Sequence, residues 1–232
     1  MGLLGMVAGT VFLKKPFFES MERRTLDTPF GTATLFLSEK LACIPRHGAD
    51  TEDHILPHRI NHRANMMALQ NLGVSEVIGI NSTGSLKKDL QPGTLVVPHD
   101  FIALAPTPSV FHNQPVHVAP SLDEALRSRL ITAAESYGVT GLAVSGVYWQ
   151  TTGPRFETKA EISMMAAFAD IVGMTMASEA VVSCELGLSY ASLCSVDNYA
   201  HGIADEPLSA DSVRETASLS ALALWNIIER LL

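Results

Sequence analysis

The stretch that decides the fold runs Val77-Ile78-Gly79-Ile80-Asn81-Ser82-Thr83-Gly84-Ser85. Its first four residues are apolar or glycine and do not alternate with polar ones, which is typical of a strand covered on both faces. Its last five residues are small or polar, which is typical of a loop. Because ligands of α/β proteins bind beyond the carboxyl ends of buried strands, this junction is a candidate site.

Similar apolar runs recur along the chain and alternate with helical segments. The further strand candidates are Leu3–Ala8, Thr32–Leu37, Leu41–Ile44, Thr94–Val97, Gly141–Tyr148, Asp170–Met174 and Ser189–Val196. The helix candidates are Ile60–Leu72, Leu122–Tyr137 behind a capping box at Ser121, and two segments behind boxes at Thr158 and Ser212. No linker or repeat divides the chain. This order predicts one α/β domain over residues 1–232, with a central mixed, largely buried twisted sheet flanked by helices.

Composition limits the classes of partner. The 232 residues include 16 Lys and Arg against 24 Asp and Glu, a net charge of −8, and 47% are apolar. A net negative chain without a run of basic residues is not expected to bind nucleic acid. The apolar start Met1–Leu13 is too short to span a bilayer and has no basic residue before it, so neither a membrane partner nor a signal peptide is expected.

Cysteine and histidine spacing predicts neither a disulfide framework nor a metal site. Cys43, Cys184 and Cys194 are odd in number and form no CxxC pair, which favours reduced thiols in a cytoplasmic protein. His54, His58 and His62 share a helical face only if a helix runs through Pro57, which would break it. We therefore expect no metal ligands.

Three strand ends offer donors to an anion. Gly9-Thr10 follows the first apolar run, Arg46-His47-Gly48 follows another, and Asn81-Ser82 follows the stretch quoted above. Glycine lets backbone N–H groups approach an oxyanion, hydroxyls add donors, and Arg binds phosphate through two parallel bonds. Together they predict a phosphate cradle, whereas each alone is equally consistent with ordinary turn chemistry.

Three later segments contain candidate contacts for a sugar and a heterocycle. For each segment a purely structural role is the alternative. Phe156 on the loop Gly153–Thr158 is a platform for a planar ring, or else it plugs the core while Arg155 pairs with Glu157. In Val172–Glu179, Thr175 can face an anion and Glu179 can accept from two sugar hydroxyls, or the acid stabilises a helix start. Asp197 and Asn198 read the edge of a heterocycle, or they turn the chain.

Taken in order, these motifs resemble the methylthioadenosine phosphorylase branch of the trimeric purine nucleoside phosphorylases. The resemblance covers about residues 3 to 230. Its motifs are Gly9-Thr10, Arg46-His47-Gly48, Pro57-x-x-Ile60-Asn61-x-Arg63-Ala64-Asn65, Asn81-x-x-Gly84-Ser85-Leu86, Gly153–Thr158 with Ala160-Glu161, and Val172-Gly173-Met174-Thr175 with Glu179. It implies the fold of purine nucleoside phosphorylases and phosphorolysis of an N-glycosidic bond.

The resemblance also implies roles for individual residues. It assigns phosphate binding to Thr10, Arg46, His47, Asn81, Ser82 and Thr175. It places Met174 under the ribose and Phe156 beside the base, and it assigns purine reading and leaving-group assistance to Asp197, with Asn198 and Tyr199 adjoining. His201 would favour a 5′-hydroxyl, whereas the final helix together with Ile203 and Leu208 would line an apolar pocket for a methylthio group.

The late loop departs from the adenine-specific pattern of the family. Those members carry Asp-Tyr-Asp, whereas this chain has Asp197-Asn198-Tyr199 and only the first acid. A 6-amino group is a donor that a carboxylate accepts, whereas a 6-oxo group needs a donor such as Asn or a protonated acid. Methylthioadenosine and methylthioinosine are both expected substrates, and inosine or guanosine is the alternative.

The expected reaction needs phosphate as co-substrate and no metal or organic cofactor. Phosphate attacks a ribosyl cation whose charge it also stabilises. The resemblance implies a homotrimer or a dimer of trimers, in which a loop such as Phe111–His117 reaches a neighbouring site. The other function classes are a nucleosidase that uses water and a protein that binds a nucleoside without cleaving it.

Overall fold

A computed structural model of the chain describes residues 2–9, 12, 16–50, 54–111, 113–205 and 208–232. The strands are β1 (Leu4–Ala8), β2 (Glu22–Thr28), β3 (Gly31–Leu37), β4 (Leu41–Pro45), β5 (Glu76–Ser85), β6 (Leu95–Val96), β7 (Asp100–Ala103), β8 (Leu142–Ala143), β9 (Val147–Gln150), β10 (Ile171–Gly173) and β11 (Ser189–Tyr199). The α-helices are α1 (His62–Asn71), α2 (Glu124–Tyr137), α3 (Lys159–Met165), α4 (Met176–Glu185) and α5 (Ala210–Glu229), with short 3-10 turns at Pro16–Phe18 and Pro57–Arg59.

The strands form one mixed sheet, as the sequence predicts. Its main path runs β2-β3-β4-β1-β5-β10-β9-β7, and β11 joins β5 and leads to β6 and β8. Strands β1, β4, β5 and β11 are parallel to their neighbours within this group, whereas β2–β3, β3–β4, β5–β10 and β6–β11 are antiparallel pairs. The fold is therefore α/β with a mixed central sheet.

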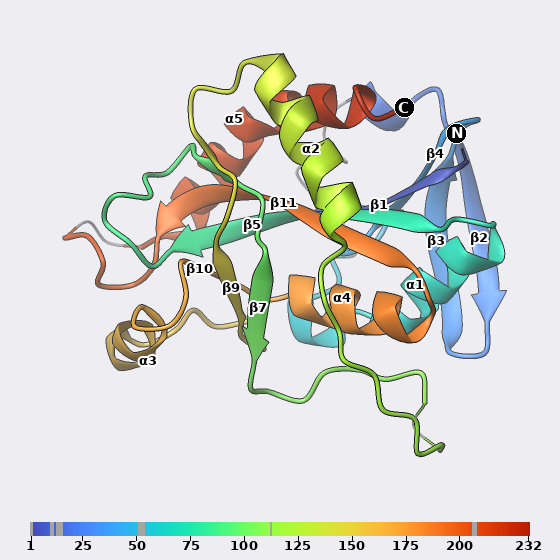
Figure 1. Cartoon of the computed structure of the whole chain (residues 1–232), viewed down its shortest axis with the longest axis horizontal. Coiled ribbons are helices and arrows are strands. Elements are labelled where there is room, and N and C mark those ends of the chain that lie inside the picture. Colours follow the sequence, from blue (N-terminus) through green and yellow to red (C-terminus); the bar gives the residue numbers. More distant parts are fainter. Residues whose placement is uncertain (1, 10–11, 13–15, 51–53, 112, 206–207) are drawn as a thin grey trace.

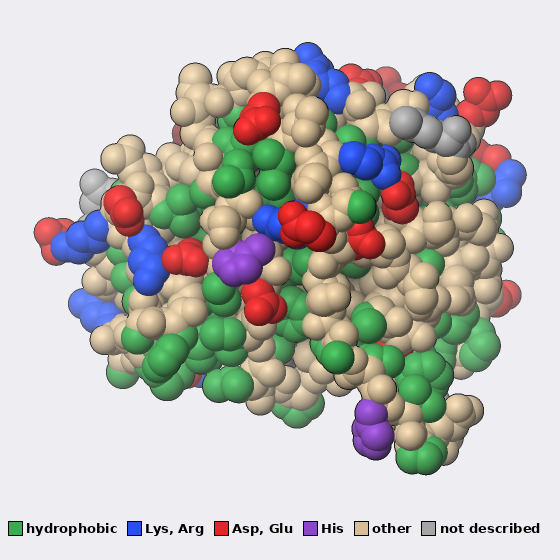
Figure 2. Space-filling view, in the orientation of Figure 1, with side chains coloured by type: hydrophobic (Ala, Val, Ile, Leu, Met, Phe, Trp, Pro, Cys, Tyr) green, Lys and Arg blue, Asp and Glu red, His purple; other side chains and the backbone are tan. Residues whose placement is uncertain are grey.

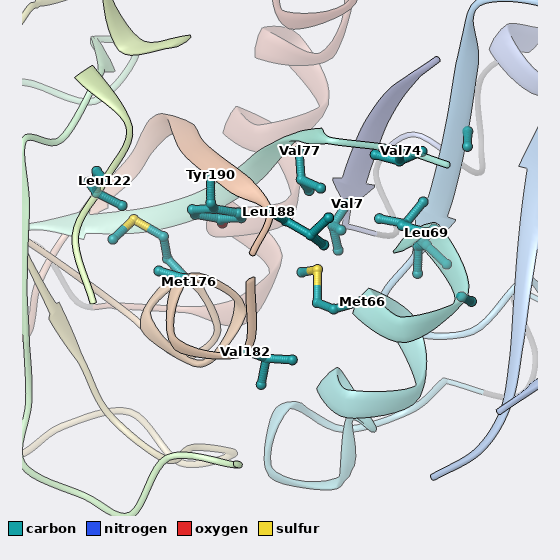
Figure 3. Packing of buried hydrophobic residues seen from close by; sticks show 14 of the residues in the cluster. Val7, Met66, Leu69, Val74, Val77, Leu122, Met176, Val182, Leu188 and Tyr190 are labelled. Atoms are coloured by element: carbon teal, nitrogen blue, oxygen red, sulfur yellow. The ribbon is translucent and has the colours of Figure 1, made fainter. Parts of the chain in front are cut away.

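Helices cover both faces of the sheet. Figure 1 shows α2 and α5 on one side and α1 and α4 on the other. Alternate residues of β5 point to different cores, since Val77 packs in the cluster with α1 and α4, whereas Ile78 and Ile80 pack in the cluster with α2 and α5. Figure 3 shows the first cluster, in which Tyr190 of β11 lies near Met176 of α4. This double burial explains the continuous apolar runs.

Strand β5 changes its partner along its length. On one edge it pairs with β1 up to Gly79 and with β10 from Gly84, while on the other edge it pairs with β11. Residues 80–83 therefore have a strand partner on the β11 side only. The polar residues 81–85 lie at this divergence, and the site is built there. The prediction that they form a loop is wrong, because they continue β5 and pair with β11.

Local predictions differ from the structure at helix ends. The capping box at Thr158 is confirmed in both of its hydrogen bonds. The box at Ser121 is wrong, because Asp123 caps α2 by accepting from the Leu126 amide. The box at Ser212 is also wrong, because α5 already begins at Ala210. Strands β2 and β7 were not predicted, since β2 has a single strongly apolar residue and β7 is only four residues long.

The distribution of charge on the surface and the character of the helices are relevant to the predictions about nucleic acid and membranes. On the face shown in Figure 2, Lys and Arg side chains lie among Asp and Glu rather than in a separate basic patch. Among the residues that the structure describes, no helix is both long enough and apolar enough to cross a membrane. Cys43, Cys184 and Cys194 are free thiols.

Candidate active site

A cavity of about 610 Å³ opens where β5 diverges from β1. Residues Ile80, Asn81, Ser82, Thr83 and Gly84 of β5 form its floor. The other walls come from the segments after β1 and β4, the loop before α3, the junction of β10 and α4, the end of β11, and α5. Segments far apart in the sequence meet here because parallel strands carry their following loops to one edge of the sheet.

Arg46, directly after β4, lies at one end of the cavity in a dense set of hydrogen bonds. Its Nε donates to Oε1 of Glu179 at 2.6 Å, and Nη2 donates to Oε2 of Glu179 at 3.2 Å and to the Val7 carbonyl at 2.9 Å. Nη1 donates to the Ile80 carbonyl at 2.7 Å. The side chain is 2% exposed. The guanidinium is thus fixed against the ends of β1 and β5.

A chain of hydrogen bonds aims the Thr175 hydroxyl. Ser192 Oγ donates to Oδ1 of Asn81 at 2.9 Å, and Nδ2 of Asn81 donates to Oγ1 of Thr175 at 2.9 Å. Since Oγ1 of Thr175 accepts from the amide, its own proton is available to another acceptor. Asn81 and Thr175 both line the cavity. This arrangement presents a polarised hydroxyl donor to an anion.

His47 is a neutral ring beside Arg46. Its Nδ1 donates to the Ile55 carbonyl at 2.8 Å, and its ring stacks on that of His54 with centroids 4.7 Å apart. Burial, and next the charge of Arg46, lower the pKa of His47 to about 4. At neutral pH the ring therefore adds no positive charge to this end of the cavity.

Other residues of the cavity lining are suited to a planar ring. Phe156, 40% exposed, lines the cavity, as do Met174, Asn198 and Glu157. Oε1 of Glu157 accepts from Oγ1 of Thr151 at 2.6 Å. Gly153, with φ of +66°, leaves room for Met174, because a Cβ there would lie 2.5 Å from its sulfur. The lining thus includes donor, acceptor and apolar side chains.

Comparison with known proteins gives the family. Residues 7–232 match the Phosphorylase superfamily. The chain is 41% identical to a probable 6-oxopurine nucleoside phosphorylase of Archaeoglobus fulgidus, over 98% of this chain and 94% of the relative. It is 38% identical to a probable S-methyl-5′-thioinosine phosphorylase of Methanocaldococcus jannaschii, over 98% and 90%.

This chain belongs to the phosphorylase superfamily. Its fold matches the methylthioadenosine phosphorylase of Schistosoma mansoni in complex with adenine, with a TM-score of 0.86 and 28% identity over 99% of this chain and 90% of that one. The predicted resemblance and fold are confirmed.

In this phosphorylase-superfamily chain, most predicted site residues share the one cavity. Arg46, His47, Asn81, Ser82, Phe156, Met174, Thr175 and Asn198 all line it. Thr10 lies outside the described residues. Assignment of these residues to phosphate, sugar or base stays a prediction.

The prediction that Glu179 accepts from sugar hydroxyls is wrong. Its carboxylate is fully buried behind the cavity wall and accepts from Arg46 and from the Tyr190 hydroxyl, which lies 2.6 Å from Oε2. Burial raises the pKa of Glu179, while the charge and hydrogen bonds of Arg46 and the hydrogen bond from Tyr190 lower it. Placing an acid one turn into α4 aims it at the sheet rather than at the cavity.

Three residues of the late loop also lie away from the cavity wall. Asp197 occupies the point where the pairing of β11 with β5 shifts register, and its side chain is buried, so Asn198 and not Asp197 lines the cavity. Tyr199 donates through its hydroxyl to the Lys88 carbonyl. Nδ1 of the exposed His201 contacts the Glu157 carbonyl at 3.0 Å. The irregularity in the strand, invisible in the sequence, decides which residue faces inward.

Sequence reasoning missed one contributor. Glu157 stands in a motif that was recognised, but its predicted partner there was Arg155, whereas Arg155 binds Glu161 at 2.7 and 2.8 Å. The capping box at Thr158 was the available signal, since it places Glu161 near the loop. The structure places Val213, Ala217 and Ser218 of α5 on the cavity wall, as predicted for the final helix, and the contact of this helix with a methylthio group stays a prediction.

Proposed function

We propose that this chain catalyses phosphorolysis of the N-glycosidic bond of a 6-oxopurine nucleoside, with 5′-methylthioinosine as the preferred substrate. The observation that carries this choice is that Asn198 and Glu157 both line the cavity. A 6-oxopurine presents N1–H as a donor and O6 and N7 as acceptors. A carboxylate accepts from N1–H and an amide donates to O6, so the two side chains complement this base.

Adenine would fit these groups less well. Its N1 is an acceptor and its 6-amino group is a donor, so the carboxylate of Glu157 and the N–H of Asn198 would each face a like group. Asn198 donates one N–H to the Tyr199 carbonyl at 2.8 Å, and the amide nitrogen has a second hydrogen for the base. The names of the archaeal relatives, which specify 6-oxopurine and methylthioinosine phosphorylases, support the same choice.

The end with Arg46 suits inorganic phosphate. Arg46 and Thr175 supply donors, and Ser82 adds an exposed hydroxyl at the floor. In the proposed reaction a phosphate oxygen bonds to C1′ of the ribose while the C1′–N9 bond breaks and its electron pair leaves with the purine. The bound anion stabilises the ribosyl cation, and the hydrogen bond from Asn198 stabilises the departing base.

The remaining wall suits the 5′ substituent. Phe12, Leu208, Val213, Ala217 and Leu224 give it an apolar surface, which supports a methylthio group. Ser218 and Arg214 line the same part of the cavity and favour a 5′-hydroxyl. Inosine or guanosine is therefore the second candidate substrate.

The proposal includes the setting of the reaction. Phosphate is the co-substrate, and the chemistry asks for no metal or organic cofactor, because phosphate supplies both nucleophile and charge. We propose a homotrimer or dimer of trimers in the cytoplasm, which sedimentation analysis and cell fractionation test directly.

Base release from methylthioinosine, inosine, guanosine, methylthioadenosine and adenosine, each with and without phosphate, tests the proposal. We expect phosphate-dependent release with the highest kcat/KM for methylthioinosine. Release without phosphate would identify a nucleosidase, and tight binding without cleavage, measured by calorimetry, would identify a binding protein. A preference for methylthioadenosine would contradict the role given to Asn198.

A further inference from the structure

Arg46 has few hydrogen-bond donors left for a ligand. A guanidinium carries five N–H groups. Four are used inside the protein, two by Glu179, one by the Val7 carbonyl and one by the Ile80 carbonyl. The fifth is on Nη1, which lies at the Gly9 side of the cavity, 3.7 Å from where a Cβ of Gly9 would stand. Arg46 therefore offers an anion one N–H rather than a two-point clamp.

The orientation of that N–H depends on a carboxylate that touches no part of the cavity. Glu179 of α4 holds both Nε and Nη2, which fixes the plane of the guanidinium. Its Oε2 in turn accepts from the hydroxyl of Tyr190 on β11 at 2.6 Å. All three side chains are nearly or fully buried. The angle at which Nη1 meets the cavity is thus set by α4 and β11.

The sheet leaves space for this group of side chains. Gly79 of β5 lies beneath it, and a Cβ there would stand 1.9 Å from the Tyr190 hydroxyl and 2.8 Å from Oε2 of Glu179. Any larger residue would displace the carboxylate. A buried ion pair adds little stability over a well-packed apolar pair, so stability alone does not account for this arrangement.

From these contacts we infer that Glu179, supported by Tyr190, is the positioning residue that aims the single free N–H of Arg46 at the attacking phosphate. The inference rests on the proposed phosphorolysis and deepens it. Glu179 acts through Arg46 and contacts no substrate. Its loss should therefore affect phosphate more than the nucleoside.

Steady-state kinetics of Glu179→Gln and Tyr190→Phe test the inference. Misplacement of a donor by about 1 Å costs up to about 100-fold, so we expect Glu179→Gln to raise KM for phosphate about 10- to 100-fold with KM for the nucleoside little changed. Tyr190→Phe keeps the ion pair and should raise KM for phosphate by a few-fold. Tyr137→Phe, whose hydroxyl accepts from Asn226 between α2 and α5, is the matched control and should change neither KM.

The outcomes separate the inference from the proposed function. If wild-type base release does not depend on phosphate, phosphorolysis itself is wrong, whatever the variants do. If wild type depends on phosphate but Tyr190→Phe raises both KM values equally, or lowers only the melting temperature, Glu179 is structural and the inference fails. A fall in KM for phosphate in Glu179→Gln would also overturn it, because Glu179 would then be masking the charge of Arg46 rather than aiming it. Should Glu179→Gln not fold, Tyr190→Phe alone decides.

Discussion

Two buried acidic side chains behind the same cavity differ in how they are paired. Glu179 accepts three hydrogen bonds, two from Arg46 and one from Tyr190. Asp197 is 2% exposed, and neither of its carboxylate oxygens makes a hydrogen bond of good geometry, although Ser82 and Ser195 lie near enough to influence it. Pairing turns a buried charge into a rigid support, whereas an unpaired carboxyl takes up a proton instead.

The pKa of Asp197 follows from this difference. Burial raises its pKa from 3.8 to about 6, and the nearby serine hydroxyls oppose the rise only in part. Near pH 6 the carboxyl therefore changes charge inside the protein. Glu179 has a cation at 2.6 Å that Asp197 lacks.

The largest expected effect comes from removing the cation of Glu179, which leaves its carboxylate buried without a charged partner, as that of Asp197 is. Arg46→Ala leaves the Glu179 carboxylate buried without its cation, which should lower the free energy of unfolding by about 3–5 kcal/mol and abolish most turnover. Chemical denaturation and phosphate-dependent kinetics measure the two effects. The double variant Arg46→Met with Glu179→Leu is the control. We expect it to recover stability but not activity, and recovery of both would remove Arg46 from the mechanism.

The next effect comes from removing the unpaired acid. In the folded state Asp197 has a raised pKa. Its contribution to the free energy of unfolding is therefore fully present below about pH 4, and it is lost as the pH rises through about 6. The pKa difference of about 2 corresponds to at most about 3 kcal/mol. Asp197→Asn should therefore be more stable than wild type at pH 8, with the advantage shrinking as the pH falls and disappearing only at about pH 3. Denaturation at both pH values measures it, and equal differences at the two would show that the carboxyl is not the cause.

A smaller effect is expected on the choice of base. Asn198→Asp replaces the amide donor with an acceptor, so it should move the ratio of kcat/KM for methylthioinosine over methylthioadenosine toward the 6-amino substrate by about 10- to 100-fold. Competition between the two nucleosides in one assay measures the ratio. Asp197→Asn should leave the ratio unchanged, since Asp197 does not line the cavity; a shift in that variant would return the role of base reading to Asp197.

The smallest effect is expected at Thr175. Thr175→Val removes the hydroxyl that receives a hydrogen bond from Asn81, at a cost of about 1–2 kcal/mol, which corresponds to about a 5- to 30-fold rise in KM for phosphate. Thr132→Val on α2, where the hydroxyl bonds only to the helix carbonyl of Ser128 in the described structure, is the matched control. An unchanged KM for phosphate would remove Thr175 from the phosphate end.

Particular residues show why the sequence predicted one part of the site and not another. Arg46 and Thr175 lie just after β4 and β10, and Asn81 lies where the apolar part of β5 ends, so the edge of the sheet gathers them whatever the rest of the chain does. Glu179 and Asp197 were misplaced because their direction depends on one turn of α4 and on one irregular residue of β11. The sequence predicted that the final helix lines the cavity, but which residues of α5 do so depends on long-range packing.

The sequence by itself determined the mixed α/β sheet, the order of its main strands and helices, and the family, because periodicity and motif order are local properties of the chain. Only the tertiary structure decided that Asn198 rather than Asp197 faces the cavity, that Glu157 joins it, and that Glu179 supports Arg46 from behind. These outcomes depend on where strand β5 exchanges β1 for β10 and where β11 shifts its register. Such events are fixed by packing between distant segments, and a shift of one residue in a strand reverses the direction of a side chain.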